Sequence, residues 1–142
     1  MKADNIKLLE FIGQSKRTFS IPVYQRNYDW KKDQCIRLFR DIEKLAESRN
    51  NVTHFLGTIV YVYGKIDAIF SEFIVIDGQQ RLTSTMLLLK ALHTCSENKD
   101  IKHEIYEEFL INRRAPERYR MKLKPIETDH DDYINLIEGA FL

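Results

Sequence analysis

The chain has 142 residues, which is enough for one ordinary domain and too few for two. Apolar residues make up 44% of it and charged residues 30%, a profile typical of soluble globular proteins. The 22 Lys and Arg against 21 Asp and Glu give a formal charge of +1, which excludes a histone-like polycation and an acidic disordered tail. Any affinity for nucleic acid must therefore come from a local patch.

The first third of the chain predicts two helices with an extended segment between them. Apolar residues at helical spacing over 6–12 predict a short helix, which the following glycine ends. Residues 18–24 are expected to be extended, because Pro22 has no backbone N–H and disfavours helix in the residue before it. A longer amphipathic helix is predicted over 31–46, with Asp29 as its N-cap.

The rest of the chain predicts a hairpin, three helices and an edge strand. Two runs rich in β-branched and aromatic residues, 55–63 and 69–76, flank a turn at 64–67 and predict a β-hairpin. The apolar stretch 78–93 predicts a central, buried helix. The later elements are expected as a helix at 101–111, an edge strand at 120–124 and a helix at 131–140. The predicted fold class is α/β (or α+β), a single domain over 1–142 in which helices pack on a small mixed sheet.

Cysteine content and segment hydropathy indicate the compartment. Cys35 and Cys95 are too few for a disulfide scaffold and are interpreted as two inert, buried thiols. The N-terminal segment is interrupted by charges, so it does not read as a signal peptide, and no stretch approaches the ~20 apolar residues of a membrane span. We expect a cytoplasmic protein that does not bind membranes.

The most informative pattern is IVIDGQQRLT at residues 74–83, where a predicted strand runs directly into the central helix. Unpaired amides and the positive end of a helix dipole meet at such a junction, which favours a bound anion such as phosphate. Gly78 allows close backbone approach, and Arg81 in the first turn can grip phosphate oxygens. The amides of Gln79 and Gln80 can orient a water or read a base edge.

The same pattern has a purely structural interpretation. Asp77 as N-cap with Gln80 three residues later is a variant of the capping box, which stabilises a helix by about 1 kcal/mol without any ligand. The carboxylate of Asp77 would also repel a phosphate unless a cation such as Mg²⁺ lay between them.

Two further segments suggest binding to nucleotides or nucleic acid. IPVYQRNYDW at 21–30 gathers three large aromatic side chains, an amide and an arginine, which suit base stacking and a phosphate grip, or else form a loop packed on the core. Residues 113–124 hold six basic side chains against one glutamate, so they predict either a nucleic-acid strip or a solvated face balanced by the acids that follow. The four histidines have no paired spacing, so no metal site is predicted.

Three segments, in this order and spacing, resemble a known family: IPVYQRNYDW (21–30), HFLGTIV (54–60) and VIDGQQRLTSTMLLLKAL (75–92). They are similar to the N-terminal domain of GmrSD-type proteins, the ParB/sulfiredoxin-like domains of modification-dependent restriction systems and related phage-defence proteins. The resemblance covers essentially the whole chain. It implies a ParB/sulfiredoxin-like α/β fold and a longer protein or system in which an HNH nuclease domain, absent here, follows or cooperates.

The resemblance also implies roles for individual residues. The family's DGQQR motif is associated with binding and hydrolysis of a nucleoside triphosphate, here GTP, UTP, CTP or ATP, with Mg²⁺ as a conjectured companion. Carried over by position, the nucleotide-binding residues are Gly78, Gln79, Gln80, Arg81, Tyr24, Gln25 and Arg26. The catalytic assignment falls on Asp77, Gln79, Gln80 and Arg81, with a glutamine orienting the attacking water.

Three functions follow as hypotheses. The favoured one is a domain that binds and hydrolyses a nucleotide and gates a separate HNH nuclease by sensing DNA, which is modified in this family's systems. An alternative is a ParB-like DNA-binding module without turnover, and a third is an interaction scaffold in which DGQQR only caps a helix. The predicted DNA contacts are Tyr24, Gln25, Arg26, Arg113, Arg114 and Arg118.

Overall fold

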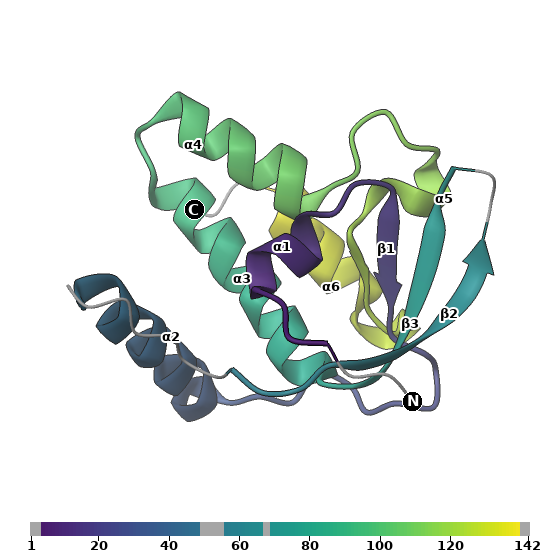
Figure 1. Ribbon diagram of the computed structural model, residues 1–142, viewed down its shortest axis with the longest axis horizontal. Coiled ribbons are helices and arrows are strands. Elements are labelled where there is room, and N and C mark those ends of the chain that lie inside the picture. The colour runs from purple at the N-terminus through teal and green to yellow at the C-terminus, as the bar shows by residue number, and fades with distance from the viewer. Residues whose placement is uncertain (1–3, 49–55, 67–68, 140–142) are drawn as a thin grey trace.

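A computed structural model of the protein describes residues 4–48, 56–66 and 69–139 (Figure 1). The first half contains, in chain order, α1 (Leu8–Gly13), β1 (Arg17–Ser20), α2 (Lys32–Glu47), β2 (Val60–Ile66) and β3 (Ser71–Asp77). The second half contains α3 (Gln79–Cys95), α4 (Lys99–Glu104), the π-helix η1 (Ile105–Leu110), α5 (Glu117–Arg120), β4 (Leu123–Lys124) and α6 (Glu127–Glu138).

The four strands form one mixed sheet in the order β2-β3-β1-β4. β1 runs parallel to both β3 and β4, with Phe19 opposite Phe73 on one side and Leu123 on the other. β2 is antiparallel to β3 and closes the predicted hairpin. The prediction of a small mixed sheet with packed helices is confirmed. Because β1 and β3 are parallel, the loops that follow them leave from the same edge of the sheet.

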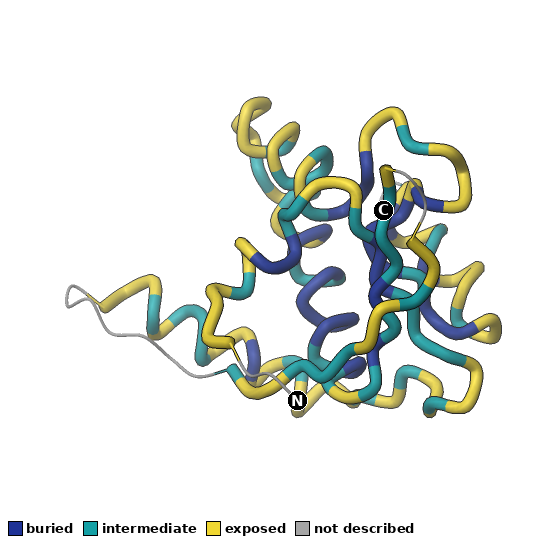
Figure 2. Tube along the Cα trace, turned by 45° about the vertical axis from the view of Figure 1, so that its right-hand side comes forward, coloured by how far each residue is buried: buried dark blue, intermediate teal, exposed yellow. Residues whose placement is uncertain are grey.

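Helix α3 is the centre of the molecule. Its buried residues lie all around the helix, and Leu82 and Met86 are fully enclosed. They pack with Phe19, Phe73 and Val75 of the sheet in one hydrophobic core. Figure 2 shows the buried segments concentrated along this helix and the strands beside it. The predicted central helix is therefore confirmed, and its first turn is fixed by the core.

Helix α2 stands apart from this core. It forms where the amphipathic pattern predicted, but only Leu38 is buried along its length, and Ile36 and Phe39 remain more than two fifths exposed. The helix extends away from the body of the protein in Figure 1. Asp29 was wrongly predicted as its N-cap: Lys31 occupies that position, and its N–H donates to the Gln34 side chain at 2.8 Å.

Several element boundaries differ from the predictions. β2 begins at Val60 and extends into the turn predicted at 64–67, as far as Ile66, while residues 55 and 67 lie outside the described ranges. The predicted edge strand shrinks to β4, because Arg120 ends the short helix α5. The last helix begins at Glu127, four residues earlier than its apolar spacing indicated.

The cysteine prediction was wrong in part. Cys95 is exposed at the end of α3, and Cys35 is half-buried on α2. Within the described residues, every helix is too short or too polar to span a lipid bilayer.

Candidate functional site

The site begins at the turn between β3 and α3. Gly78 has φ 93°, in the left-handed region, and a Cβ on it would lie 2.9 Å from the backbone oxygen of Thr58. Its N–H donates to the carboxylate of Asp77 at 3.0 Å. Gly78 itself is the N-cap and has no side-chain cap, so the capping box between Asp77 and Gln80 is wrong. The turn requires glycine because of backbone geometry and space together.

The two glutamines of the motif hold the upstream loop against α3. Gln80 donates through Nε2 to the carbonyl of Asn27 at 2.9 Å and accepts through Oε1 from the N–H of Asp29 at 3.0 Å. Gln79 donates to Oε1 of Gln25 at 3.1 Å, and Gln25 in turn donates to the carbonyl of Ile76 at 3.0 Å. Four hydrogen bonds thus hold residues 25–29 against the end of β3 and the start of α3, and one of them, between Gln79 and Gln25, joins the two motifs directly.

The same loop is also fixed to α6. The N–H of Tyr28 donates to Asp129 at 2.7 Å, and the Thr128 hydroxyl donates to the side-chain oxygen of Asn27 at 3.0 Å. The Tyr28 hydroxyl lies 2.7 Å from that of Ser84 and 3.4 Å from the sulfur of Cys35. Burial is the main cause that raises the pKa of Tyr28 to about 12. The phenol therefore stays neutral at physiological pH and serves as a hydrogen-bonding group.

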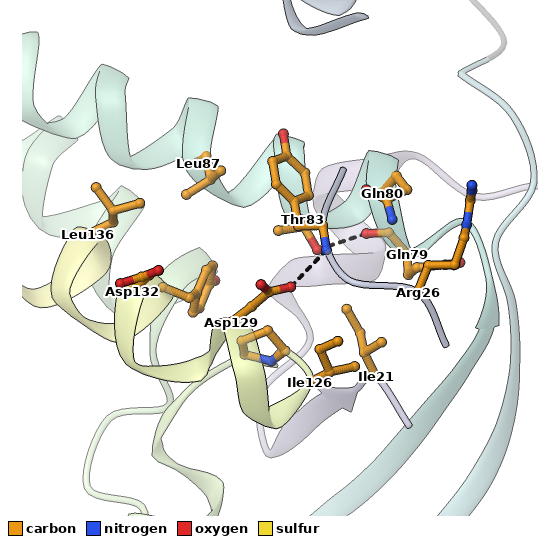
Figure 3. A pocket seen from close by; sticks show the side chains of 13 residues that line it. Ile21, Arg26, Gln79, Gln80, Thr83, Leu87, Ile126, Asp129, Asp132 and Leu136 are labelled. Carbon is orange, nitrogen blue, oxygen red and sulfur yellow. Dashed lines mark hydrogen bonds between the residues drawn. The ribbon is translucent and has the colours of Figure 1, made fainter. Parts of the chain in front are cut away.

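These contacts enclose a cavity of about 250 Å³ between the loop, α3 and α6 (Figure 3). Arg26, Gln79, Gln80 and Thr83 line one part of it. Its apolar lining is formed by Ile21, Leu87, Pro125, Ile126 and Leu136. The remaining lining residues are Tyr28, Asp129, Asp132 and Tyr133. A concave site with an apolar wall and a few converging polar groups is the usual form of a small-molecule site.

Charges of both signs border the cavity. Arg26 is largely exposed and pairs with Asp29 at 3.4 Å, while Asp129 and Asp132 face the cavity from α6. Tyr133 is 4% exposed, and its hydroxyl is buried without a hydrogen-bond partner among the described residues. Burial also raises the pKa of Tyr133, so its hydroxyl stays neutral and can donate a hydrogen bond to a ligand in the cavity.

Some predicted site residues lie elsewhere. Arg81 does not line the cavity: its guanidinium packs against Gly57, where a Cβ would collide with it. Asp77 is exposed and bonded to its own turn, and Tyr24 is 72% exposed beside the loop. Of the predicted nucleotide-binding residues, Arg26, Gln79 and Gln80 line the cavity and Gln25 is bonded to Gln79, whereas Gly78, Arg81 and Tyr24 do not line it.

The other predicted DNA contacts lie at the opposite end of the sheet. Arg118 is 5.4 Å from the ring of Tyr119, which stacks on Phe70 immediately before β3 begins. The cavity loop instead bonds Ile76 near the end of the same strand. Seven residues of extended chain separate the two ends by about 20 Å. The basic strip is also discontinuous, because Lys122 is buried and Arg113 and Arg120 pair with glutamates.

Sequence reasoning missed the contribution of α6. Asn27, Thr128, Asp129, Asp132 and Tyr133 all shape the site, and none was singled out as a site residue. The acids at 129–132 were considered as charges that could balance the basic segment before them. Their pairing with a loop a hundred residues earlier has no signal in a single sequence.

Comparison with known proteins places this geometry in a family. The family model described as the N-terminal domain of GmrSD restriction endonuclease matches residues 8–142, which include both motifs and the α6 wall of the cavity. A search of curated proteins finds no match. On the extent of that match, the chain belongs to the GmrSD restriction endonuclease N-terminal domain family.

Proposed function

We propose that this restriction-system domain binds and hydrolyses a nucleoside triphosphate in the cavity and couples the bound nucleotide to DNA sensing. The observation that carries the proposal is the pair of motif glutamines, which bring Arg26 and the start of α3 to one cavity. The family supplies the restriction context. Nucleotide hydrolysis requires mainly positioning and charge compensation, which a small preorganised site can provide.

In this proposal, Arg26, Gln79 and Gln80 have different roles in binding and hydrolysing the nucleotide. Arg26 is the one cationic side chain among the lining residues, so it is the group that would pair with phosphate oxygens. Gln80 has both amide atoms committed to the loop, so it would position and not react. Gln79 has one amide atom bonded, and its Oε1 is the better candidate to orient an attacking water.

The acidic wall bears on the conjectured Mg²⁺. Asp129 and Asp132 would repel a bare triphosphate, whereas Mg²⁺ is typically held by one or two carboxylates together with substrate phosphates. One oxygen of Asp129 already accepts the Tyr28 N–H, so Asp132 and the other oxygen of Asp129 would hold the ion. Within the described ranges no three His, Cys, Asp or Glu side chains form a metal cluster, so such an ion would depend on the nucleotide.

The test is phosphate release from GTP, ATP, CTP and UTP with Mg²⁺, together with calorimetric binding. We expect Arg26→Ala to lose affinity by about tenfold or more, because one charge-assisted hydrogen bond contributes about 1.5–3 kcal/mol. Arg37→Ala, which removes an exposed arginine of α2, is the matched control and should bind normally. Arg81→Ala tests whether the nucleotide binds in the cavity or at the DGQQR motif as a whole, because Arg81 belongs to the motif but does not line the cavity. Unchanged nucleotide affinity would show that Arg81 is not part of the binding site.

A binding module without turnover is the second candidate function. One observation favours it: the four predicted catalytic residues do not lie together. Gln79 and Gln80 line the cavity, whereas Asp77 and Arg81 do not. Saturable nucleotide binding without phosphate release would support it. An absence of nucleotide binding would contradict both candidates and leave DNA binding alone to be tested.

A further inference from the structure

A basic cluster lies at the other end of α3 from the cavity. Lys90 and His93 are three residues apart, so they share one face of the helix, and Lys102 reaches this place from α4. Lys90 lies ten residues beyond Gln80, which is about 15 Å along the helix axis. The cluster is therefore separate from the site proposed above.

Lys90 is the unusual member of the cluster. It is 5% exposed, and it makes no hydrogen bond or ion pair with any residue that the structure describes. Its ammonium lies 6.0 Å from the ring centroid of Tyr106, at the outer limit of a cation–π contact. The stem of the side chain is buried while its ammonium keeps contact with solvent, and no described residue supplies that ammonium with a counter-charge.

Among the described residues, the neighbours of Lys90 in this cluster supply hydrogen-bond donors, and the charge that acts on it is that of Lys102. Lys102 donates to the carbonyl of His93 at 2.9 Å, which holds its ammonium at the end of α3. The His93 ring lies 5.7 Å from Tyr106, and its Nδ1 is buried without a partner among the described residues. Desolvation, followed by repulsion from Lys102, lowers the pKa of Lys90, and desolvation with repulsion from both lysines lowers that of His93.

A helix C-terminus favours nearby cations, which accounts for Lys102 at the His93 carbonyl. It does not account for a second ammonium, that of Lys90, close enough to Lys102 for the two charges to repel each other. Two ammoniums and an imidazole that gather with no acid from the described ranges match an oxyanion with several acceptor oxygens.

We propose that Lys90, His93 and Lys102 form a second, phosphate-binding site at the interface of α3 and α4. The ligand is a dianionic phosphate group, supplied either as inorganic phosphate or as the phosphate of a mononucleotide. One phosphate can bridge the two ammoniums and take a third hydrogen bond from the imidazole. The anion would supply the counter-charge that Lys90 lacks in the folded chain.

The experiment follows the His93 ring by NMR during titration with inorganic phosphate or GMP, against sodium chloride at equal ionic strength and pH. The His93 signal is assigned by its disappearance in His93→Gln. We expect a saturable shift in the wild-type protein. Lys90→Met should weaken the apparent affinity about tenfold or more, from the loss of one charge-assisted hydrogen bond. Lys99→Met, on the exposed side of α4, should leave it unchanged.

Lys102→Met is the second variant, in case Lys90→Met disturbs folding, and it should also weaken binding. Tighter binding of GMP than of inorganic phosphate would identify a nucleotide as the source, and equal affinity would identify free phosphate. Either result supports the site when it depends on Lys90 or Lys102. The proposal is overturned if neither ligand gives a saturable shift, or if both methionine variants bind like the wild type.

Discussion

Adjacent glutamines in the motif have unlike roles because their side chains leave α3 in different directions. Gln80 uses both ends of its amide to satisfy backbone groups of Asn27 and Asp29, so it replaces the hydrogen bonds that a strand or helix would give this loop. Gln79 makes one side-chain bond, to Gln25, and keeps an acceptor for the cavity. Gln80 therefore has a structural role, whereas Gln79 keeps one atom that can take part in chemistry.

Replacing Gln80 with leucine tests this division. Gln80→Leu leaves the carbonyl of Asn27 and the N–H of Asp29 without their partner, at a cost of about 1–3 kcal/mol in unfolding free energy. Gln79→Leu is the matched control and should cost less, because Gln25 keeps its bond to Ile76. Urea unfolding of both variants measures the difference. Equal losses in the two variants would show that Gln80 has no special structural role.

Lys122 predicts a pH dependence of stability. Its side chain is 1% exposed and donates to the carbonyl of Gln14 at 2.7 Å, and desolvation is the main cause that lowers its pKa from 10.5 to about 8. Between these values the unfolded chain binds the extra proton, so the unfolding free energy of the wild type should rise with pH relative to Lys122→Met. Urea unfolding of both proteins at pH 7 and pH 9.5 measures this. Parallel changes in the two proteins would contradict the shifted pKa.

At the scale of elements, the β3–α3 turn depends on Gly78. Gly78→Ala places a Cβ in the left-handed region and against the Thr58 backbone, so we expect a loss of at least about 1 kcal/mol in unfolding free energy. Gly64→Ala in β2 is the control, because φ there is ordinary and the atoms nearest its Cβ would belong to the side chains of Glu72 and Ile74 and not to the backbone. Thermal unfolding compares them. A Gly78→Ala protein as stable as the control would mean that the turn tolerates a side chain.

Helix α2 should be the least protected long helix. It contributes one buried residue, whereas α3 contributes nine, and an isolated helix of its length is marginal in water. We expect its amides to exchange hydrogen much faster than those of α3 in native-state exchange. Exchange at similar rates in both helices would show that α2 is held by contacts that the described residues do not provide.

The element predictions succeeded where one periodic pattern decided the structure. The apolar run of α3 and the β-branched hairpin were identified because burial and local propensity agree there. Asp29 was misassigned as a cap because its surroundings are set by a distant partner, the Gln80 side chain. Local rules for capping cannot include such a contact.

The candidate site was predicted in part for the same reason. Gln25, Arg26, Gln79 and Gln80 were named from two motifs, and they do converge. The α6 wall could not be found, because Asp129 reaches the loop and Tyr133 reaches the cavity only through the fold of the whole chain. Arg26 and Arg118 were both predicted as DNA contacts, and the topology places them at opposite ends of the sheet, which the sequence could not indicate.

At the scale of the whole molecule, the predicted DNA contacts Arg113, Arg114 and Arg118 can be tested separately from the cavity, because the two places are far apart. If DNA lies along Arg113, Arg114 and Arg118, replacing all three with alanine removes up to three phosphate contacts. The slope of log affinity against log salt should then fall by as much as about 2.7, since each contact contributes about 0.9. The rate of phosphate release from the nucleotide should be unchanged, because the cavity and the three arginines lie at opposite ends of β3.

The control for that variant removes the same charge from another surface. Arg37, Arg40 and Lys44 are exposed on α2, so replacing them with alanine lowers the net charge equally without touching either predicted DNA surface. Fluorescence anisotropy of a labelled duplex across a salt series compares the two triple variants. If both lose the same slope, DNA responds to overall charge and not to Arg113, Arg114 and Arg118. If only the first variant changes, the DNA contact lies at the end of the sheet opposite the cavity, and any coupling between the two would have to act across the length of the sheet.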